Sequence, residues 1–333
     1  MNKHLLLALT LCVSLHGYGQ KMHQLVSPNG NIQVSINISD KIYYDIVCQK
    51  DTLLKQCNLQ MQLGDEEAGN HPKLIKANRK SINESLKPII ALKHSTVSNK
   101  YNQLQLKFKG DYSVEFRAFD DGIAYRFITN KKGMIEVGNE IFQVNFPENY
   151  LLHMQQPGGF KTAYEEEYRH VQSQEWKATG SMALLPLLID TRKDYKILIS
   201  ESALADYPAL FLKSNDRNGM LSVFPKVPLE FGEDGDRSLK ILKEANYIAK
   251  TNGQRCFPWR YFVITKDDGQ LIENTMTYKL ADKNVLEDTS WIKPGLASWE
   301  WWNGATPYGQ DVDFVAGCNL DTYKYFIDFA AHY

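Results

Sequence analysis

The chain has 333 residues, of which 43% are hydrophobic, and its formal net charge is -1 at pH 7. This composition is that of a globular protein with room for one large domain or two smaller ones. The near-zero charge, with both signs interspersed, gives no electrostatic basis for binding nucleic acid or an anionic membrane.

Residues 1–19 predict a secretory signal peptide, with a polar start, an apolar centre at 5–15 and small residues for cleavage before Gln20. The apolar centre is too short to span a bilayer. A lipoprotein anchor at Cys12 is the alternative, but the bulky residue before it disfavours that anchor. We therefore expect an exported protein without a membrane span.

From residue 27 to about residue 265 the dominant pattern alternates apolar and polar residues. Alternation indicates strands with one buried and one solvated face, which is typical of antiparallel sheets. Turn sequences rich in Gly, Pro, Asn and Asp separate the runs, and no long helix intervenes, so packed sheets are predicted. The alternating runs are residues 32–38, 104–109, 112–119, 123–127, 196–199, 220–224 and 261–264.

Two stretches depart from this pattern. Residues 66–95 are more polar and irregular, and we interpret them as a long surface excursion between strands. Residues 271–280 have helical spacing, and the stretch that follows to residue 293 is charged and without periodicity. We therefore expect a domain over residues 20–270 and a linker over residues 271–293.

The last 40 residues predict a strand, a loop and a helix. Residues 295–304 are typical of a short buried strand that ends in a loop. Residues 316–330 carry an apolar helical face, and either Asn319 or Asp321 offers a side-chain oxygen to cap the helix. Strand and helix together predict the first unit of a parallel β/α architecture over residues 294–333.

Four cysteines remain after the signal peptide, and their spacing fits no zinc motif. Cys48 and Cys57 could form a disulfide across a hairpin. Free buried thiols are favoured, because a chain of this length does not need disulfides to fold.

Seven segments together resemble glycoside hydrolase family 97, in an order and spacing that are fairly specific. The resemblance covers nearly all of the mature chain. The segments are Ser27–Gly30, Phe116–Phe127, Tyr164–Tyr168, Ser200–Pro208, Pro258–Arg260, Trp299–Asn303 and Thr322–Ala330.

The resemblance implies a mainly β chain: a large antiparallel β-super-sandwich followed by the first β/α unit of a truncated (β/α)8 barrel. It implies a secreted, calcium-dependent bacterial α-glycosidase, in the periplasm or on the outer surface, that hydrolyses α-linked glucosides or galactosides. We favour α-glucosides slightly, on family breadth alone. The catalytic carboxylates of the family lie on later barrel strands, so no catalytic residue is assigned and this chain alone is expected to be inactive.

The segment Tyr164–Tyr168 holds three adjacent glutamates, which repel one another and favour a bound cation. Calcium suits such a cluster because it prefers six to eight oxygen ligands. The resemblance matches Glu165 to a calcium ligand, with Glu167 as the second choice, whereas a solvated acidic turn is the alternative interpretation. His153 and His170 flank this cluster, and we interpret each as a merely hydrogen-bonded residue.

At the end of the predicted terminal strand, Trp301, Trp302 and Asn303 are candidate substrate-binding residues. Indole faces stack on the C–H face of a sugar ring, and an amide can bond a hydroxyl group. Packing against the helix layer is the alternative for at least one of the indoles. Glu300 has no evident carboxylate partner, so we interpret it as structural.

A hypothesis from a different class is a non-catalytic carbohydrate-binding β-sandwich. The apolar strand and helix at the end of the chain argue against it, because an isolated binding module would leave them uncovered. An α-linked oligosaccharide is the expected partner, as the substrate of the glycosidase.

Overall fold

The computed structural model describes residues 21–236 and 238–333, with the side chains of Lys21, Trp302 and Asn303 not described. The predicted signal peptide therefore lies outside the described residues. The described residues form two compact units: one contains residues 21–87 and 93–283, and the other contains residues 88–92 and 284–333.

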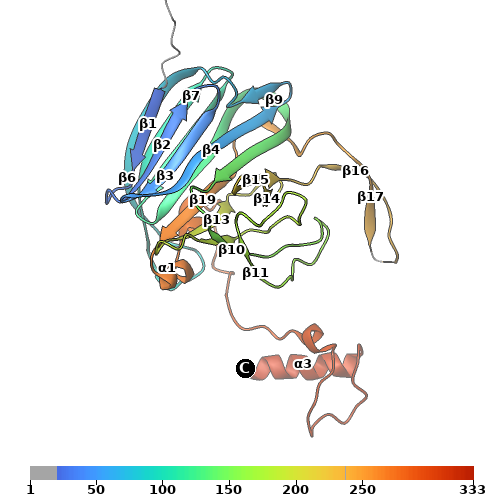
Figure 1. Ribbon diagram of the computed structural model, residues 1–333. Coiled ribbons are helices and arrows are strands. Elements are labelled where there is room, and N and C mark those ends of the chain that lie inside the picture. Colours follow the sequence, from blue (N-terminus) through green and yellow to red (C-terminus); the bar gives the residue numbers. More distant parts are fainter. Residues whose placement is uncertain (1–20, 237) are drawn as a thin grey trace, which may run out of the picture. The chain divides into compact units, whose positions relative to one another are not determined.

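The first unit is built almost entirely of antiparallel strands, which confirms the predicted mainly β fold (Figure 1). The strands of its first half are β1 (Lys21–Val26), β2 (Ile32–Ile38), β3 (Ile42–Cys48), β4 (Asp51–Leu63), β5 (Glu66–Ala68), β6 (Leu74–Leu86), β7 (Val97–Phe108), β8 (Tyr112–Phe119) and β9 (Gly122–Asn145). Those of its second half are β10 (Leu151–Met154), β11 (Arg169–Gln172), β12 (Leu187–Asp190), β13 (Lys196–Ser202), β14 (Phe211–Ser214), β15 (Gly219–Val223), β16 (Pro228–Glu233), β17 (Leu239–Glu244), β18 (Ala249–Cys256) and β19 (Trp259–Thr265).

Strand β9 connects the two layers of the sandwich. Its beginning pairs with β8 on one side and β19 on the other, at Phe116↔Tyr125 and Phe262↔Ile123. Its end pairs with β4, at Leu59↔Phe142, and then with β15. One layer continues from β4 through β3 and β2 to β1, and the other continues from β19 through β13, β12 and β10 to β11. A single long strand thus belongs to both sheets.

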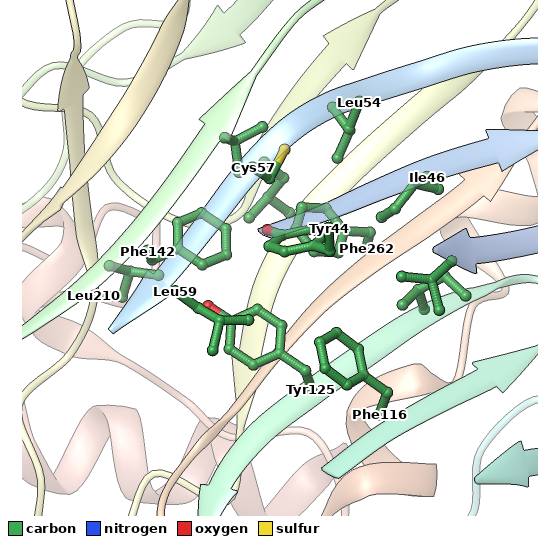
Figure 2. Close-up of a cluster of buried hydrophobic side chains, with 14 of the residues drawn as sticks. Tyr44, Ile46, Leu54, Cys57, Leu59, Phe116, Tyr125, Phe142, Leu210 and Phe262 are labelled. Atoms are coloured by element: carbon green, nitrogen blue, oxygen red, sulfur yellow. The ribbon is translucent and has the colours of Figure 1, made fainter. Parts of the chain in front are cut away.

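The inner faces of the two sheets form the main core. Tyr44 of β3 contacts three rings from the opposite layer, with centroids 6.2 Å from Phe116, 5.8 Å from Tyr125 and 6.3 Å from Phe262. Figure 2 shows these rings meeting between the strands. In β2 and β3, alternation places every second side chain in this layer, as the pattern of residues 32–38 predicts for β2.

Strand β19 is buried along its whole length, and so departs from the one-sided pattern predicted for residues 261–264. Phe262 faces the main core, whereas Trp259 and Tyr261 face a second cluster on the outer side of the sheet. Met276 and Leu280 complete that second cluster. Both belong to α2 (Met276–Leu280), the second of the two short helices after the strand; the first is α1 (Asp268–Ile272).

These two short helices correspond to the helical spacing at residues 271–280. They lie within the first compact unit, which extends to residue 283, although the sequence analysis placed them in a linker. The first helix is capped at Glu273, and the side chain of the next residue, Asn274, accepts a hydrogen bond from the amide of Met276 at 2.8 Å. Thr277 then binds Tyr261 through a hydroxyl contact of 2.7 Å.

The prediction of a surface excursion at residues 66–95 is wrong. Strand β6 occupies residues 74–86 and pairs with β7 from Leu74↔Phe108 to Leu86↔Val97. Its pattern is polar because β6 is an edge strand with mostly exposed side chains. Charged and polar side chains protect such an edge from pairing with another chain.

In the second unit the predicted helix is confirmed and the predicted strand is wrong. Helix α3 (Leu320–His332) begins at Asn319, whose side chain accepts a hydrogen bond from the amide of Thr322 at 3.0 Å. The stretch expected to be a strand contains instead the 3-10 helix η1 (Glu300–Asn303), and no strand occurs in the described residues 284–333. A strand needs a hydrogen-bonded neighbour, which this unit does not supply.

The cysteines of the described residues are free thiols, as favoured from the sequence. Cys48 and Cys57 are buried in the main core, whereas Cys256 and Cys318 are exposed. No helix of the described residues is long and apolar enough to cross a membrane.

Candidate functional site

The three adjacent glutamates lie on the loop that connects β10 to β11, at residues 155–168. Residues 163–168 form neither strand nor helix. All three glutamate side chains are exposed. The loop therefore offers its carboxylates to solvent and not to the sandwich interior.

Aromatic packing and hydrogen bonds give this loop a defined conformation. The rings of Phe160 and Tyr164 lie on Phe211 of β14, with centroid distances of 5.0 Å and 5.9 Å. The Tyr164 hydroxyl donates to the carbonyl of Phe160, and Gln155 Nε2 donates to the carbonyl of Glu166 at 2.5 Å. The backbone that precedes Glu165 is thereby fixed.

A second support comes from the β16–β17 hairpin. Lys161 Nζ donates to Asp234 Oδ2 and to the carbonyl of Leu239, both at 2.7 Å. Both oxygens belong to the turn region of that hairpin. The loop is thus held on one side by β14 and on another by β16–β17.

The glutamates do not make a complete calcium site by themselves. Among residues 21–236 and 238–333, no group of three or more His, Cys, Asp or Glu side chains is placed to hold a metal ion. Calcium prefers six to eight oxygen ligands. Glu165 therefore fits the contribution of one carboxylate to such an ion, and the described donor set does not fit a whole site.

The tryptophan candidates belong to the second compact unit. Trp299 and Trp301 stack on each other, with ring centroids 5.8 Å apart and an interplanar angle of 22°. Trp301 is 73% exposed, so one indole face is open to a ligand. The backbones of Trp302 and Asn303 lie in η1, and their side chains are outside the described structure.

A buried ion cluster that the sequence analysis did not find lies between the sheets. Arg260 of β19 is fully buried and binds Glu140 of β9 in a bidentate pair, with Nε–Oε1 and Nη2–Oε2 distances of 2.8 Å. Its Nη1 also binds Glu201 of β13. Burial alone lowers the pKa of Arg260, but Glu140 and Glu201 raise it above its ordinary value, so the guanidinium stays protonated.

Glu201 also accepts hydrogen bonds from the amide of Leu210, at 3.2 Å to each carboxylate oxygen. Burial raises the pKa of Glu201, and the charge of Arg260 opposes that shift. Every group in the cluster is thus engaged by another part of the sandwich, and its role is structural. The signal in the sequence was a charged residue, Glu140, within a strand of alternating apolar residues.

A second charged cluster covers the outer face of β19. The guanidinium carbons of Arg117 and Arg126 lie 4.4 Å and 4.2 Å from the ring centroid of Trp259. Glu115 binds both arginines, at 2.9 Å and 3.2 Å. Cation–π contacts and ion pairs together fix the indole, so the role of this cluster is structural.

Two hollows on the described surface of the sandwich do not bring two carboxylates together. One is lined by Asp111 and otherwise by neutral and basic side chains from β7, β8, β9 and β18. Another, between β1, β6 and β7, has no acidic residue in its lining. Glycoside hydrolysis requires two carboxyl groups across the scissile bond, and neither hollow supplies them.

Comparisons with known proteins connect this architecture to carbohydrate hydrolysis. A family 97 enzyme from Pseudoalteromonas sp. strain K8, solved in complex with acarbose, superposes with a TM-score of 0.76 at 22% identity, over 93% of this chain and 46% of that one. A beta-arabinopyranosidase superposes with a TM-score of 0.74 at 20% identity, over 93% of this chain and 49% of that one. The fold is therefore the β-super-sandwich that occurs in glycoside hydrolases.

The particular family follows from the sequence. The family model "Glycosyl-hydrolase 97 N-terminal" matches residues 25–282. A retaining alpha-galactosidase of Bacteroides thetaiotaomicron is 34% identical over 99% of this chain and 51% of its own length. A probable retaining alpha-galactosidase of Streptomyces bingchenggensis is 26% identical over 69% of this chain and 31% of its own length. The chain belongs to glycoside hydrolase family 97, which confirms the resemblance found in the sequence.

The chain spans about half the length of the Bacteroides relative, and less of the Streptomyces one. The match with the family model ends at residue 282, at the boundary of the first compact unit.

Proposed function

We propose that the chain supplies the N-terminal part of an exported, calcium-dependent glycosidase that acts on α-galactosides with retention of configuration. The observation that carries this proposal is 34% identity, over 99% of the chain, to a protein named retaining alpha-galactosidase. Family breadth alone favoured α-glucosides slightly, and identity of this extent outweighs that preference. The name of the second relative points in the same direction.

Within this function the sandwich contributes the β10–β11 loop. Glu165 provides one oxygen ligand to calcium, with Glu167 as the second choice, and the loop contacts described above hold the backbone that presents it. Residues 294–333 correspond to the start of the catalytic barrel, and Trp301, Trp302 and Asn303 contact the sugar. The exposed stack of Trp299 and Trp301 supports this role for the indoles.

The chain alone is proposed to be inactive. A retaining glycosidase uses two carboxyl groups about 5–5.5 Å apart, one as acid and base and one as nucleophile. In the family these groups lie on later barrel strands. The 333-residue chain is therefore expected to release no p-nitrophenol from p-nitrophenyl α-galactoside or α-glucoside, and measurable turnover would contradict the proposal.

Substrate preference and calcium binding are testable in a chimera that replaces the matching half of the Bacteroides relative with this chain. We expect hydrolysis of p-nitrophenyl α-galactoside, with the α-glucoside cleaved far more slowly. Glu165→Gln should weaken the apparent affinity for calcium about 10- to 100-fold, as loss of supporting groups around a metal commonly does.

The matched control is Glu166→Gln, which removes a carboxylate of the same loop and should leave calcium affinity within about twofold. Equal effects of the two variants would reject Glu165 as the ligand. A correctly folded chimera without activity, together with sugar binding by the chain alone, would favour a non-catalytic carbohydrate-binding protein.

A further inference from the structure

A pair of histidines closes the base of the loop that carries Glu165. His153 of β10 and His170 of β11 lie directly opposite each other in the antiparallel register, one residue from the loop end of the ladder at Met154↔Arg169. Their Nδ1 atoms are 2.7 Å apart, and their rings meet edge to face with centroids 4.7 Å apart. The contact therefore links the two strands close to the loop, in addition to the bond from Gln155 to the Glu166 carbonyl within it.

This geometry depends on protonation, because the bond joins nitrogen to nitrogen. One Nδ1 must donate a proton and the other must accept it, so the acceptor ring has to lack a proton at that atom. The pair satisfies this condition when both rings are neutral, and also when one is an imidazolium. When both rings are protonated, two N–H groups and two positive charges face each other, and the hydrogen bond is lost.

The surrounding charges do not remove this conflict. Asp190 of β12 is the acidic group that acts on His153, but it is also bound to Lys196 of β13, with an Nζ–Oδ2 distance of 3.3 Å. Burial lowers the pKa of His153, and the charges of His170 and Lys196 lower it further, whereas Asp190 raises it. The net direction is downward, so the folded hairpin resists protonation of His153.

We propose that His153 and His170 are positioning residues that close the base of the Glu165 loop while at most one of them is protonated, and that release the loop when both are protonated. The link to calcium rests on the proposed function, whereas the closure itself concerns only the hairpin. Because strands β10 and β11 share only four residue pairs, loss of one cross-strand contact affects a large part of the hairpin.

The direction of the pH dependence follows from the lowered pKa of His153. The folded hairpin binds this proton less readily than the unfolded chain does, where the value is the ordinary 6.5. The stabilising contribution is therefore complete above pH 6.5 and is lost as the pH falls below 6.5 towards the lowered value. We expect the histidine end of the loop to be closed at neutral pH and to open in acid, while the contacts with β14 and the β16–β17 hairpin remain.

The test uses the full 333-residue chain without calcium or sugar. The histidine ring nitrogens are followed by NMR from pH 8 to pH 4.5, and hydrogen exchange of residues 155–168 is measured over the same range and corrected for intrinsic rates. We expect the second proton to enter the pair only below pH 6.5, and exchange at the base of the loop to rise at least about tenfold as both rings become protonated.

Two variants separate protonation from packing. His153→Phe combined with His170→Phe keeps a cross-strand aromatic pair without a titratable proton, and should leave the loop closed at every pH tested. His170→Ala should move the pKa of His153 up towards 6.5 and leave the loop open throughout. His94→Gln, at an exposed histidine elsewhere in the unit, is the control and should behave as the unmodified chain.

The proposal is overturned if the double phenylalanine variant opens in acid as the unmodified chain does, or if His170→Ala leaves both the titration of His153 and loop exchange unchanged. Neither readout involves calcium or hydrolysis. Failure of Glu165 to bind calcium would therefore reject the proposed function and leave the histidine closure standing. Failure of the histidine variants to alter loop exchange would reject the closure and leave the proposed function standing.

Discussion

In the first compact unit the rings of Phe116 and Phe262 are completely buried, whereas in the second unit the indoles of Trp291 and Trp301 are 69% and 73% exposed. Both regions contain large apolar side chains at regular spacing. In the first, the strands that carry them have hydrogen-bonded neighbours in a sheet and an opposing layer. In the second, a single helix and a 3-10 turn have neither. Apolar residues specify a core only where the topology brings a second surface to cover them.

This comparison predicts a large difference in thiol reactivity. Cys57 of β4 is buried, and burial raises the pKa of its thiol to about 12. Alkylation at pH 8 should therefore require unfolding of the first unit and be at least about a thousandfold slower than at Cys318, which is exposed in the second. Mass spectrometry of timed iodoacetamide reactions would measure both rates, and comparable rates would show that the sandwich opens readily.

Removal of a ring tests the same contrast by stability. Phe262→Ala deletes a side chain that packs on Tyr44 and Phe142, with centroids 6.3 Å and 5.7 Å away, and should lower the free energy of unfolding by about 4 kcal/mol. Leu296→Ala removes a side chain that is 98% exposed and should change it by less than about 0.5 kcal/mol. Urea titration followed by tryptophan fluorescence measures both, and similar losses would refute the distinction.

The buried charges of the first unit should contribute almost as much. Arg260→Met removes the partner of Glu140 and leaves a carboxylate uncompensated between the sheets, which should cost about 3 kcal/mol in the same titration. Lys250→Gln breaks an ion pair with Glu136 on the exposed surface of the same strand β9. That control should cost less than about 1 kcal/mol, and equal costs would show that burial of the pair is immaterial.

The smallest expected effect concerns the helix of the second unit. Asn319→Ala removes the side chain that caps α3 and should destabilise its first turn by about 1 kcal/mol, which corresponds to about fivefold faster amide exchange there. Asp321→Asn alters the other candidate cap of the sequence analysis and should have a weaker effect, limited to its charge near the helix start. The reverse ranking would assign the cap to Asp321.

Local sequence patterns predicted the strands that bury one face, and they failed where burial depends on distant elements. Alternation located β2, β13 and the second half of β7 because each buries one face, and that signal is local. It missed β6, where an edge position allows polar residues on both faces, and it misread β19, whose second buried face depends on α2. The strand expected near Trp301 fails for the complementary reason, because a local pattern does not reveal whether a partner strand is present.

At the candidate site, local sequence patterns reveal the residue types but not the contacts between distant residues. The glutamate cluster and the flanking histidines were visible in the sequence, and their residue types indicate the chemistry. That Glu165 stands on an exposed loop depends on Phe211, far along the chain, which supports Tyr164. That His153 meets His170 depends on the register of β10 with β11. Neither relation is encoded within a few neighbouring residues.

The shared strand β9 also determines when the domain can be finished during synthesis. Its partners range from β4, which begins at residue 51, to β19, which ends at residue 265. Until the ribosome has released that last partner, β9 carries a free edge and an uncovered apolar face. A nascent chain halted before this point would expose a surface that invites aggregation, so chaperone protection is most needed over that interval of translation.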